Sequence, residues 1–115
     1  MPHREAACIA AELSPPFSIL GAGRQAAPLI FNSPHSGRIY PSVLIEASRL
    51  SPKALRKSED AYVEELFSAT VWQGAALMHA HFPRAYLDIN REPYELDPML
   101  FRGDLPPFAN TQSLR

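Results

Sequence analysis

The sequence contains only one cysteine, Cys8, and it has no run of Lys or Arg and no long apolar segment. A single cysteine excludes an internal disulfide, so a reducing cytoplasm is the expected location. With a formal net charge of −1, the chain is not expected to bind nucleic acid or an anionic membrane. No apolar run approaches the roughly 20 residues of a membrane helix, and the N-terminus does not resemble a signal peptide.

What the sequence does have is apolar residues and proline. Of its 115 residues, 46% are hydrophobic and 20% are charged, which is typical of one globular unit that buries a modest core. The 12 prolines are about twice the usual share. Proline fixes φ and removes a hydrogen-bond donor, so the segments around these prolines are expected to be rigid surface loops. Loops of this kind can also hold polar site residues in fixed positions.

The first part of the chain is expected to hold one strand. Residues 1–26 contain turn formers, and we expect a weakly ordered lead-in there, followed by part of a single domain over residues 27–115. The apolar run 27–31 is stopped by turn formers at 32–34, which predicts a buried strand. Buried strands usually belong to parallel or mixed sheets that helices cover.

Two helices and two further strands are expected after this strand. Ser51-Pro52 predicts the start of a short helix, because Ser caps a helix and Pro fits its first turn. Ser58 is expected to cap a second helix, with apolar residues at helical spacing up to a stop at Gly74. Residues 75–80 and 85–90 predict strands. This order of elements predicts an α/β fold with a mixed sheet flanked by helices.

His35 is the first candidate site residue. It follows the predicted strand, and sites in open α/β sheets form outside the carboxyl ends of strands. An imidazole there can bind a metal ion or move a proton, although a surface histidine in a rigid turn is an equally good interpretation. Glu59 and Asp60 are the second candidates. They either complement the positive end of the predicted helix or place one carboxylate as a metal ligand.

The segment from Arg84 to Arg91 is the third candidate. Asp88 and Asn90 are two residues apart in the predicted strand and therefore share a face. Arg91 offers a planar pair of donors for a substrate carboxylate, and Asn90 offers both a donor and an acceptor. The alternative interpretation is a surface ion pair between Asp88 and an arginine.

The remaining motifs are weaker. His79 and His81 share a face of a predicted strand, but such a pair is more typical of ordinary structure than of a metal site. Ser33 and Ser36 flank His35, yet no Gly-x-Ser-x-Gly nucleophile motif of a serine hydrolase is present.

Three blocks of the sequence resemble the N-formylglutamate amidohydrolase family. They are Asn32-Ser33-Pro34-His35-Ser36-Gly37-Arg38-x-Tyr40-Pro41, Ser58-Glu59-Asp60-x-Tyr62-Val63-x-Glu65-Leu66-Phe67, and Arg84-Ala85-Tyr86-x-Asp88-x-Asn90-Arg91-x-Pro93-x-Glu95-Leu96-Asp97-Pro98. The blocks stand in the family's order. Members of this family remove the formyl group from N-formyl-glutamate, often late in histidine breakdown, and their fold resembles that of zinc-dependent exopeptidases and aspartoacylases.

The resemblance implies a role for individual residues. His35 is similar to the first metal ligand of aspartoacylase-like enzymes, and residues 88–91 are similar to the stretch that binds the acidic end of their substrate. Those relatives carry a Glu three residues after the His, where this sequence has Arg38. The acidic ligand is therefore expected to be Glu59 or Asp60, and the expected cofactor is a divalent metal ion, zinc.

The resemblance also implies catalytic and substrate contacts. The metal ion and a nearby donor, Arg84 or Asn90, are expected to stabilise the oxyanion of the reaction. The substrate, an N-acyl acidic amino acid, is expected to contact Arg38, Asp88, Asn90 and Arg91.

The length of the family members implies that part of the site lies elsewhere. They are more than twice as long as this chain, so the third metal ligand and the water-activating carboxylate are expected beyond Arg115. The chain is then expected to be inactive alone, with a missing C-terminal half or a second copy in a homo-oligomer as its partner. The competing interpretation is a non-catalytic, partner-binding remnant that uses an uncovered sheet edge.

Overall fold

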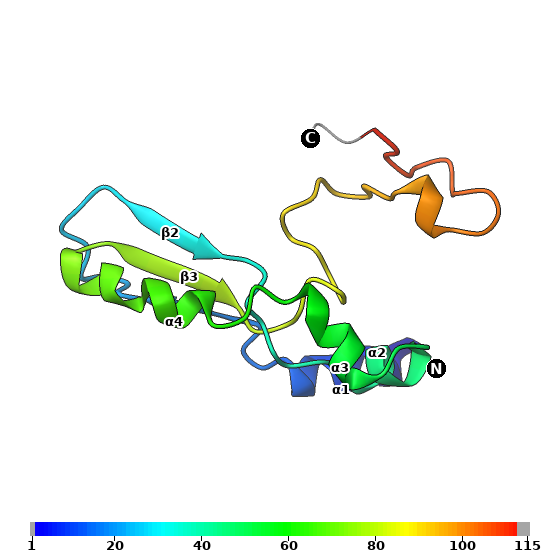
Figure 1. Cartoon of the computed structure of the whole chain (residues 1–115), viewed down its shortest axis with the longest axis horizontal. Coiled ribbons are helices and arrows are strands. Elements are labelled where there is room, and N and C mark those ends of the chain that lie inside the picture. The colour runs from blue at the N-terminus through cyan, green and yellow to red at the C-terminus, as the bar shows by residue number, and fades with distance from the viewer. Residues whose placement is uncertain (1, 113–115) are drawn as a thin grey trace.

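The computed structural model describes residues 2–112 of the chain. Its centre is a three-stranded mixed sheet in the order β1-β3-β2, formed by β1 (Phe17–Leu20), β2 (Ile30–Ser33) and β3 (Ala76–Ala80) (Figure 1). β1 runs antiparallel to β3, and β2 runs parallel to it, with Ser33 opposite His79. The mixed sheet and its helices confirm the predicted α/β class.

Short helices precede, connect and follow the strands along the chain. They are α1 (Pro2–Glu12), α2 (Ser42–Ala47), α3 (Pro52–Leu55) and α4 (Val63–Phe67), with the 3-10 helices η1 (Arg56–Ser58), η2 (Ser68–Gln73) and η3 (Pro98–Leu100). α4 contacts β2 and β3, and the ring centroids of Phe31 and Phe67 lie 5.8 Å apart. α1, α2 and α3 gather at the opposite end of the molecule from the start of β2 (Figure 1). Among the described residues, no helix has the length and apolar character needed to cross a membrane.

The core is small and lies around β3. Leu77 is fully buried in this strand, and the neighbouring buried residues Ala75, Ala76 and Ala80 have small side chains. The radius of gyration is 16.5 Å, whereas a compact domain of this length is expected to have about 13 Å. The segment after β3 accounts for part of this difference, because it runs away from the sheet as an extended arm (Figure 1).

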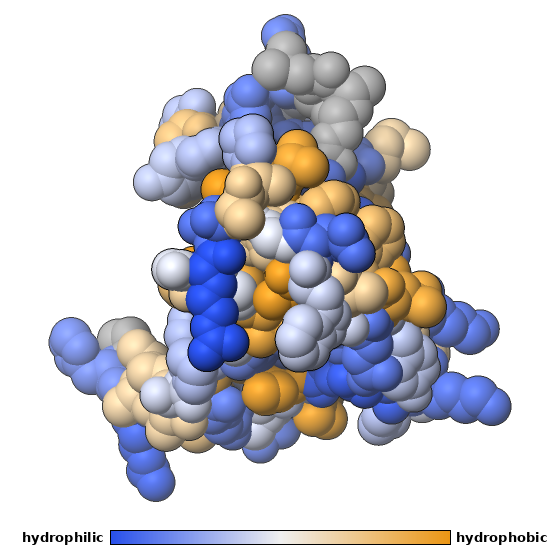
Figure 2. Space-filling view, turned by 90° about the vertical axis from the view of Figure 1, so that its left-hand side faces the viewer, coloured by the Kyte–Doolittle hydropathy of each residue, from blue (hydrophilic) through white to orange (hydrophobic). Residues whose placement is uncertain are grey.

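β2 differs from the strand that the sequence predicted. It begins at Ile30 and is only partly buried: 72% of the Ile30 surface is exposed, whereas Ser33 at its end is buried. The reason is that β2 lies at an edge of the sheet, since β3 alone of the three described strands has a strand on both sides. Figure 2 shows apolar surface between hydrophilic side chains at the end of the molecule that carries the start of β2. An apolar run predicts a strand but not its position in the sheet.

The predicted helix start at Ser58 is wrong. Ser58 ends η1, and its hydroxyl donates a hydrogen bond to a carbonyl of the preceding turn. α4 begins only at Val63, after Tyr62 in a left-handed backbone conformation with a φ of 65°. Glu59 and Asp60 therefore precede the helix, and their carboxylates make tertiary contacts instead of complementing a helix dipole.

Three other local predictions are confirmed. The Ser51 hydroxyl accepts a hydrogen bond from the amide of Ala54 and so caps α3. Gly74 ends η2 with a φ of 83°. Residues 76–80 of the apolar run 75–80 form β3, the central strand.

The predicted strand at 85–90 is wrong. The chain turns after β3, where the amides of Tyr86 and Leu87 both donate to the carbonyl of Pro83. Near the N-terminus, α1 and β1 lie within residues 1–26, where we expected a weakly ordered lead-in.

Candidate active site

The parallel pair of β2 and β3 brings two loops together at the carboxyl ends of these strands. β2 ends there at Ser33, and β3 ends there at Ala80. The Ile39 amide donates a hydrogen bond of 2.9 Å to the His81 carbonyl, which ties the loop after β2 to the loop after β3. The carboxyl ends of parallel strands are the usual position of sites in α/β sheets. The candidate site lies at these carboxyl ends.

His35 lies between two carboxylates, just beyond the carboxyl end of β2. The residue is buried, and its Nε2 atom lies 2.7 Å from Asp88 Oδ1 while its Nδ1 atom lies 3.5 Å from Asp60 Oδ2. The Asp60 amide also donates a hydrogen bond of 3.0 Å to the His35 carbonyl. Residues that are far apart in the sequence thus meet around one imidazole.

The contacts of the His35 ring define its hydrogen positions. The Asp88 carboxylate only accepts hydrogen bonds, so Nε2 carries a hydrogen and donates it. In the neutral ring, Nδ1 then has a lone pair that faces an oxygen of Asp60. Two acceptors that face each other repel unless a proton or a cation lies between them. The His35 side chain is only 7% exposed, but 51% of the Asp60 side chain is exposed, so solvent reaches the acidic side of this contact.

Asp88 is the centre of the segment that follows β3. Its carboxylate accepts hydrogen bonds from His35, the Asn90 amide and Arg84, at 2.7, 3.0 and 3.2 Å. The Nε atom of Arg91 lies 3.5 Å from Asp88 Oδ2. A turn held by the Asp88 side chain, not a shared strand face, therefore brings these residues together. Asn90 takes part through its backbone.

Asp88 also predicts a pH dependence of stability. Burial raises the pKa of Asp88, but hydrogen bonds from His35, the Asn90 amide and Arg84 outweigh burial and lower the pKa from 3.8 to about 2. A carboxylate whose pKa is lower in the folded chain than in the unfolded chain stabilises the fold at a pH above its unfolded-state pKa. This contribution is lost as the pH falls toward the folded-state pKa. We expect urea denaturation to show that the unfolding free-energy difference between the unmodified chain and Asp88→Asn shrinks from about pH 4 to about pH 2. A constant difference would contradict this assignment.

Glu59 and Asp60 have different surroundings. The Glu59 side chain is only 1% exposed, and its Oε1 atom accepts hydrogen bonds from the Tyr40 hydroxyl at 2.7 Å and from Arg56 at 3.0 Å. Burial raises the pKa of Tyr40, and the hydrogen bond to Glu59 raises it further, so the phenol stays protonated and donates. Asp60 is the acid that faces His35, while Glu59 anchors the same segment to its surroundings.

Arg38 contacts α4. Its Nη2 atom donates hydrogen bonds to Glu64 at 2.9 Å and Glu65 at 3.1 Å, and its guanidinium lies 5.1 Å from the centroid of the Tyr62 ring. The structure thus separates the sequence-predicted residues into groups. Arg38 is bound to the acids of α4, and Glu59 is bound to Tyr40 and Arg56. The cluster around the buried imidazole consists of His35, Asp60, Arg84, Asp88 and Arg91.

Comparison with known proteins places this chain in a family. A family model described as N-formylglutamate amidohydrolase matches residues 27–113. The chain belongs to the N-formylglutamate amidohydrolase family. It is also similar to the crystal structure of an N-formylglutamate amidohydrolase from Ralstonia eutropha JMP134 at 2.00 Å resolution, with 36% sequence identity and a TM-score of 0.70.

The similarity to this N-formylglutamate amidohydrolase covers 83% of the present chain and 34% of the solved chain. The present chain therefore spans about a third of the length of that relative. A search among curated proteins gave no match.

Membership of the N-formylglutamate amidohydrolase family confirms the resemblance found in the sequence. Each sequence block supplies part of the cluster: the first supplies His35, the second Asp60, and the third Arg84, Asp88 and Arg91. The sequence reasoning missed Asp88 as the hydrogen-bond partner of His35. The usual pairing of a metal-binding imidazole with a carboxylate was the signal that could have found it. It also missed the buried Glu64, which no pattern distinguishes from the exposed Glu65 beside it.

Proposed function

We propose that the cluster around His35 is this chain's part of the active site of a metal-dependent amidohydrolase. The proposed reaction is hydrolysis of the formyl amide of N-formyl-glutamate, or of a similar N-acyl acidic amino acid, to formate and glutamate. Family membership supports the reaction class. The two acceptors that face each other at His35 and Asp60 carry the proposal of a metal. Zinc is the proposed ion, because imidazole and carboxylate are among its preferred ligands.

The spacing of these residues fits zinc. Zn–N and Zn–O distances are about 2.0–2.2 Å, so two ligands in a tetrahedral arrangement lie about 3.3–3.5 Å apart. The 3.5 Å between His35 Nδ1 and Asp60 Oδ2 agrees with this spacing. Asp88 holds the other ring nitrogen, as carboxylates do for many metal-binding histidines. Over residues 2–112, no three His, Cys, Asp or Glu side chains are grouped to hold a metal ion. We infer that a third ligand comes from the part of the family domain that this chain does not span.

The chain's own residues have proposed roles in the reaction. When bound, zinc polarises the amide carbonyl and lowers the pKa of its water to about 7. Asp88 orients the metal-binding ring and holds Arg84 and Arg91 in place. Arg84 and Asn90 are the proposed donors to the oxyanion that forms at the formyl carbon. Arg91 and Arg38 are the proposed partners of the glutamate carboxylates, which match the planar guanidinium.

Formate release from N-formyl-L-glutamate tests the proposed reaction. We expect little or no turnover by the 115-residue chain with zinc, because two protein ligands hold zinc weakly compared with three. A polypeptide that corresponds to the rest of the family domain is expected to restore turnover. Robust activity of the chain alone would overturn the inference that the site is completed from elsewhere. Inactivity of the combined polypeptides would overturn the proposed reaction.

Asp60→Asn and Glu59→Gln are a matched pair that tests the acidic ligand. We expect Asp60→Asn to weaken zinc binding by at least about tenfold, because it removes the charge that faces His35 Nδ1. Glu59→Gln should leave zinc affinity within about twofold and instead destabilise the fold by about 1–3 kcal/mol, since it weakens a buried charged hydrogen-bond network. Zinc titration against a competing chelator and urea denaturation measure the two effects. The opposite order of zinc affinities would identify Glu59 as the ligand.

A second candidate function is a non-catalytic, partner-binding role. The open edge of β2 and the exposed Ile30 favour it, because unpaired backbone groups at an exposed strand edge readily pair with another strand. The partner would be the rest of the family domain or a second copy in a homo-oligomer. Sedimentation equilibrium distinguishes them: a dimer of the chain alone supports the homo-oligomer, and a mass increase only on addition of the other polypeptide supports the heteromeric pair.

A further inference from the structure

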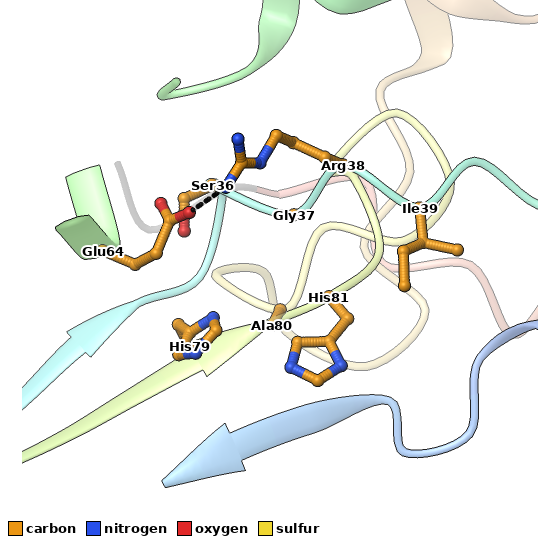
Figure 3. A pocket seen from close by; sticks show the side chains of 8 residues that line it. All are labelled: Ser36, Gly37, Arg38, Ile39, Glu64, His79, Ala80 and His81. Atoms are coloured by element: carbon orange, nitrogen blue, oxygen red, sulfur yellow. Dashed lines mark hydrogen bonds and ion pairs between the residues drawn. The ribbon is translucent and has the colours of Figure 1, made fainter. Parts of the chain in front are cut away.

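A pocket beside the candidate site holds a buried acid that the proposed reaction does not use. The pocket has a volume of about 200 Å³, and Arg38, Glu64, His79 and His81 are among the residues that line it (Figure 3). This volume is below the roughly 300–1,000 Å³ of sites for drug-sized ligands, so the pocket suits a molecule no larger than about one amino acid. Its wall also includes Ser36, which directly follows His35 in the chain.

One carboxylate oxygen of Glu64 lacks a hydrogen-bond partner. The Glu64 side chain is 10% exposed, and its Oε1 atom accepts a hydrogen bond of 2.9 Å from Arg38. Its Oε2 atom is buried and has no partner within the described part of the chain. A buried charged oxygen without a donor is costly, so native proteins usually supply one. Figure 3 shows Glu64 beside Arg38 at the wall of the pocket.

The neighbours of Glu64 define the kind of donor that fits. Burial lowers the pKa of His79, and the nearby His81 lowers it further, so the His79 ring is neutral at pH 7 and does not repel a cation. Glu64 and Glu65 together carry one more negative charge than Arg38 balances, which favours a positively charged group. The hydrogen bonds of Arg38 to both acids come from Nη2, so its other N–H groups can bind a carboxylate.

We propose that this pocket binds a free α-amino acid, with its ammonium group at Glu64 Oε2 and its carboxylate at the remaining N–H groups of Arg38. The identity of the amino acid rests on the proposed function, which releases glutamate. N-formyl-glutamate has a neutral amide in place of the ammonium group, so it cannot balance the charge of Glu64. The pocket therefore prefers glutamate, the product, over N-formyl-glutamate, the substrate. Arg38 can bind a carboxylate group of either molecule.

Nuclear magnetic resonance titration of the nitrogen-15-labelled, metal-free chain tests this proposal with L-glutamate, N-formyl-L-glutamate and glutarate. The last two compounds lack the ammonium group, and no turnover is needed. We expect L-glutamate to shift the amide signals of Ser36, Gly37 and Ala80, and to bind at least about tenfold more tightly than the other two compounds. Equal affinities, or no shift with any compound, would overturn the proposal.

Glu64→Gln and Glu65→Gln provide the matched control, because both acids pair with Arg38 but the Glu65 side chain is 61% exposed. We expect Glu64→Gln to lose at least about tenfold in L-glutamate affinity and Glu65→Gln to stay within about twofold. An equal loss in both variants would overturn the role of the buried oxygen. Because the titration contains no metal, its failure leaves the zinc and formate tests intact. Selective L-glutamate binding together with failed zinc and formate tests would reject only the proposed reaction.

Discussion

Replacing His35 with alanine is expected to remove zinc binding from the chain. The substitution deletes the Nδ1 donor and leaves Asp60 as the single protein ligand on this side of the cluster. Loss of a residue that supports a metal ligand typically lowers metal affinity by about 10- to 100-fold. Loss of the ligand itself should have a larger effect, so we expect zinc affinity to fall by about 100-fold or more. Competition between the chain and a chromogenic chelator for zinc measures the effect.

The control for this prediction separates ligand loss from misfolding. His35→Gln keeps an amide donor that can reach toward Asp88 but lacks the imidazole ligand, so it should fold like the unmodified chain and still fail to bind zinc. His3→Ala removes an exposed imidazole from α1 and should leave zinc affinity unchanged. Unchanged zinc binding by both His35 variants would reject the ligand role of His35.

Replacing Gly37 with alanine is expected to lower the free energy of unfolding by about 3 kcal/mol or more. A Cβ atom at this position would lie 2.1 Å from the Phe82 carbonyl oxygen and 2.6 Å from the His81 carbonyl carbon. These are backbone atoms, and the hydrogen bond from Ile39 to His81 holds the two loops together. The same loops carry His35 and Asp88, so zinc affinity should fall together with stability. Urea denaturation and zinc titration test both effects.

Gly23→Ala is the control for the Gly37 substitution. Gly23 has a φ of +74°, and an added Cβ atom would meet nothing within 4 Å. Its replacement therefore introduces only backbone strain, about 1–2 kcal/mol. Equal destabilisation by the two substitutions would show that the loops after β2 and β3 can separate at little cost.

Local chemistry explains which structural predictions succeeded. The Ser51 hydroxyl caps α3 through the amide of Ala54, and Gly74 stops η2 through its own left-handed backbone. In both cases the partners are neighbours in the sequence. Ser58 has the same capping chemistry, but its hydroxyl bonds backward and the helix begins later, after Tyr62. A capping residue predicts a helix only where the following residues are not drawn into other contacts.

Long-range contacts explain the predictions that failed. The segment 85–90 has the residue types of a strand, yet within residues 2–112 no partner strand lies beside it, and its polar groups bond around Asp88 instead. The run that forms β2 is apolar enough for a buried strand, but its position at the sheet edge leaves Ile30 exposed. Neither outcome depends on local propensity, because each depends on which other segments pack against the element.

By itself, the sequence determined the family, the mixed α/β class and the position of His35 just after a strand, because motif residues, caps and apolar runs act over a few neighbouring positions. Only the tertiary structure decided that Asp60 faces His35 while Glu59 is buried against Tyr40. It also decided that Asp88 binds the ring and that Glu64 keeps an oxygen without a partner among the described residues. These features depend on distance and burial between segments that are remote in the sequence.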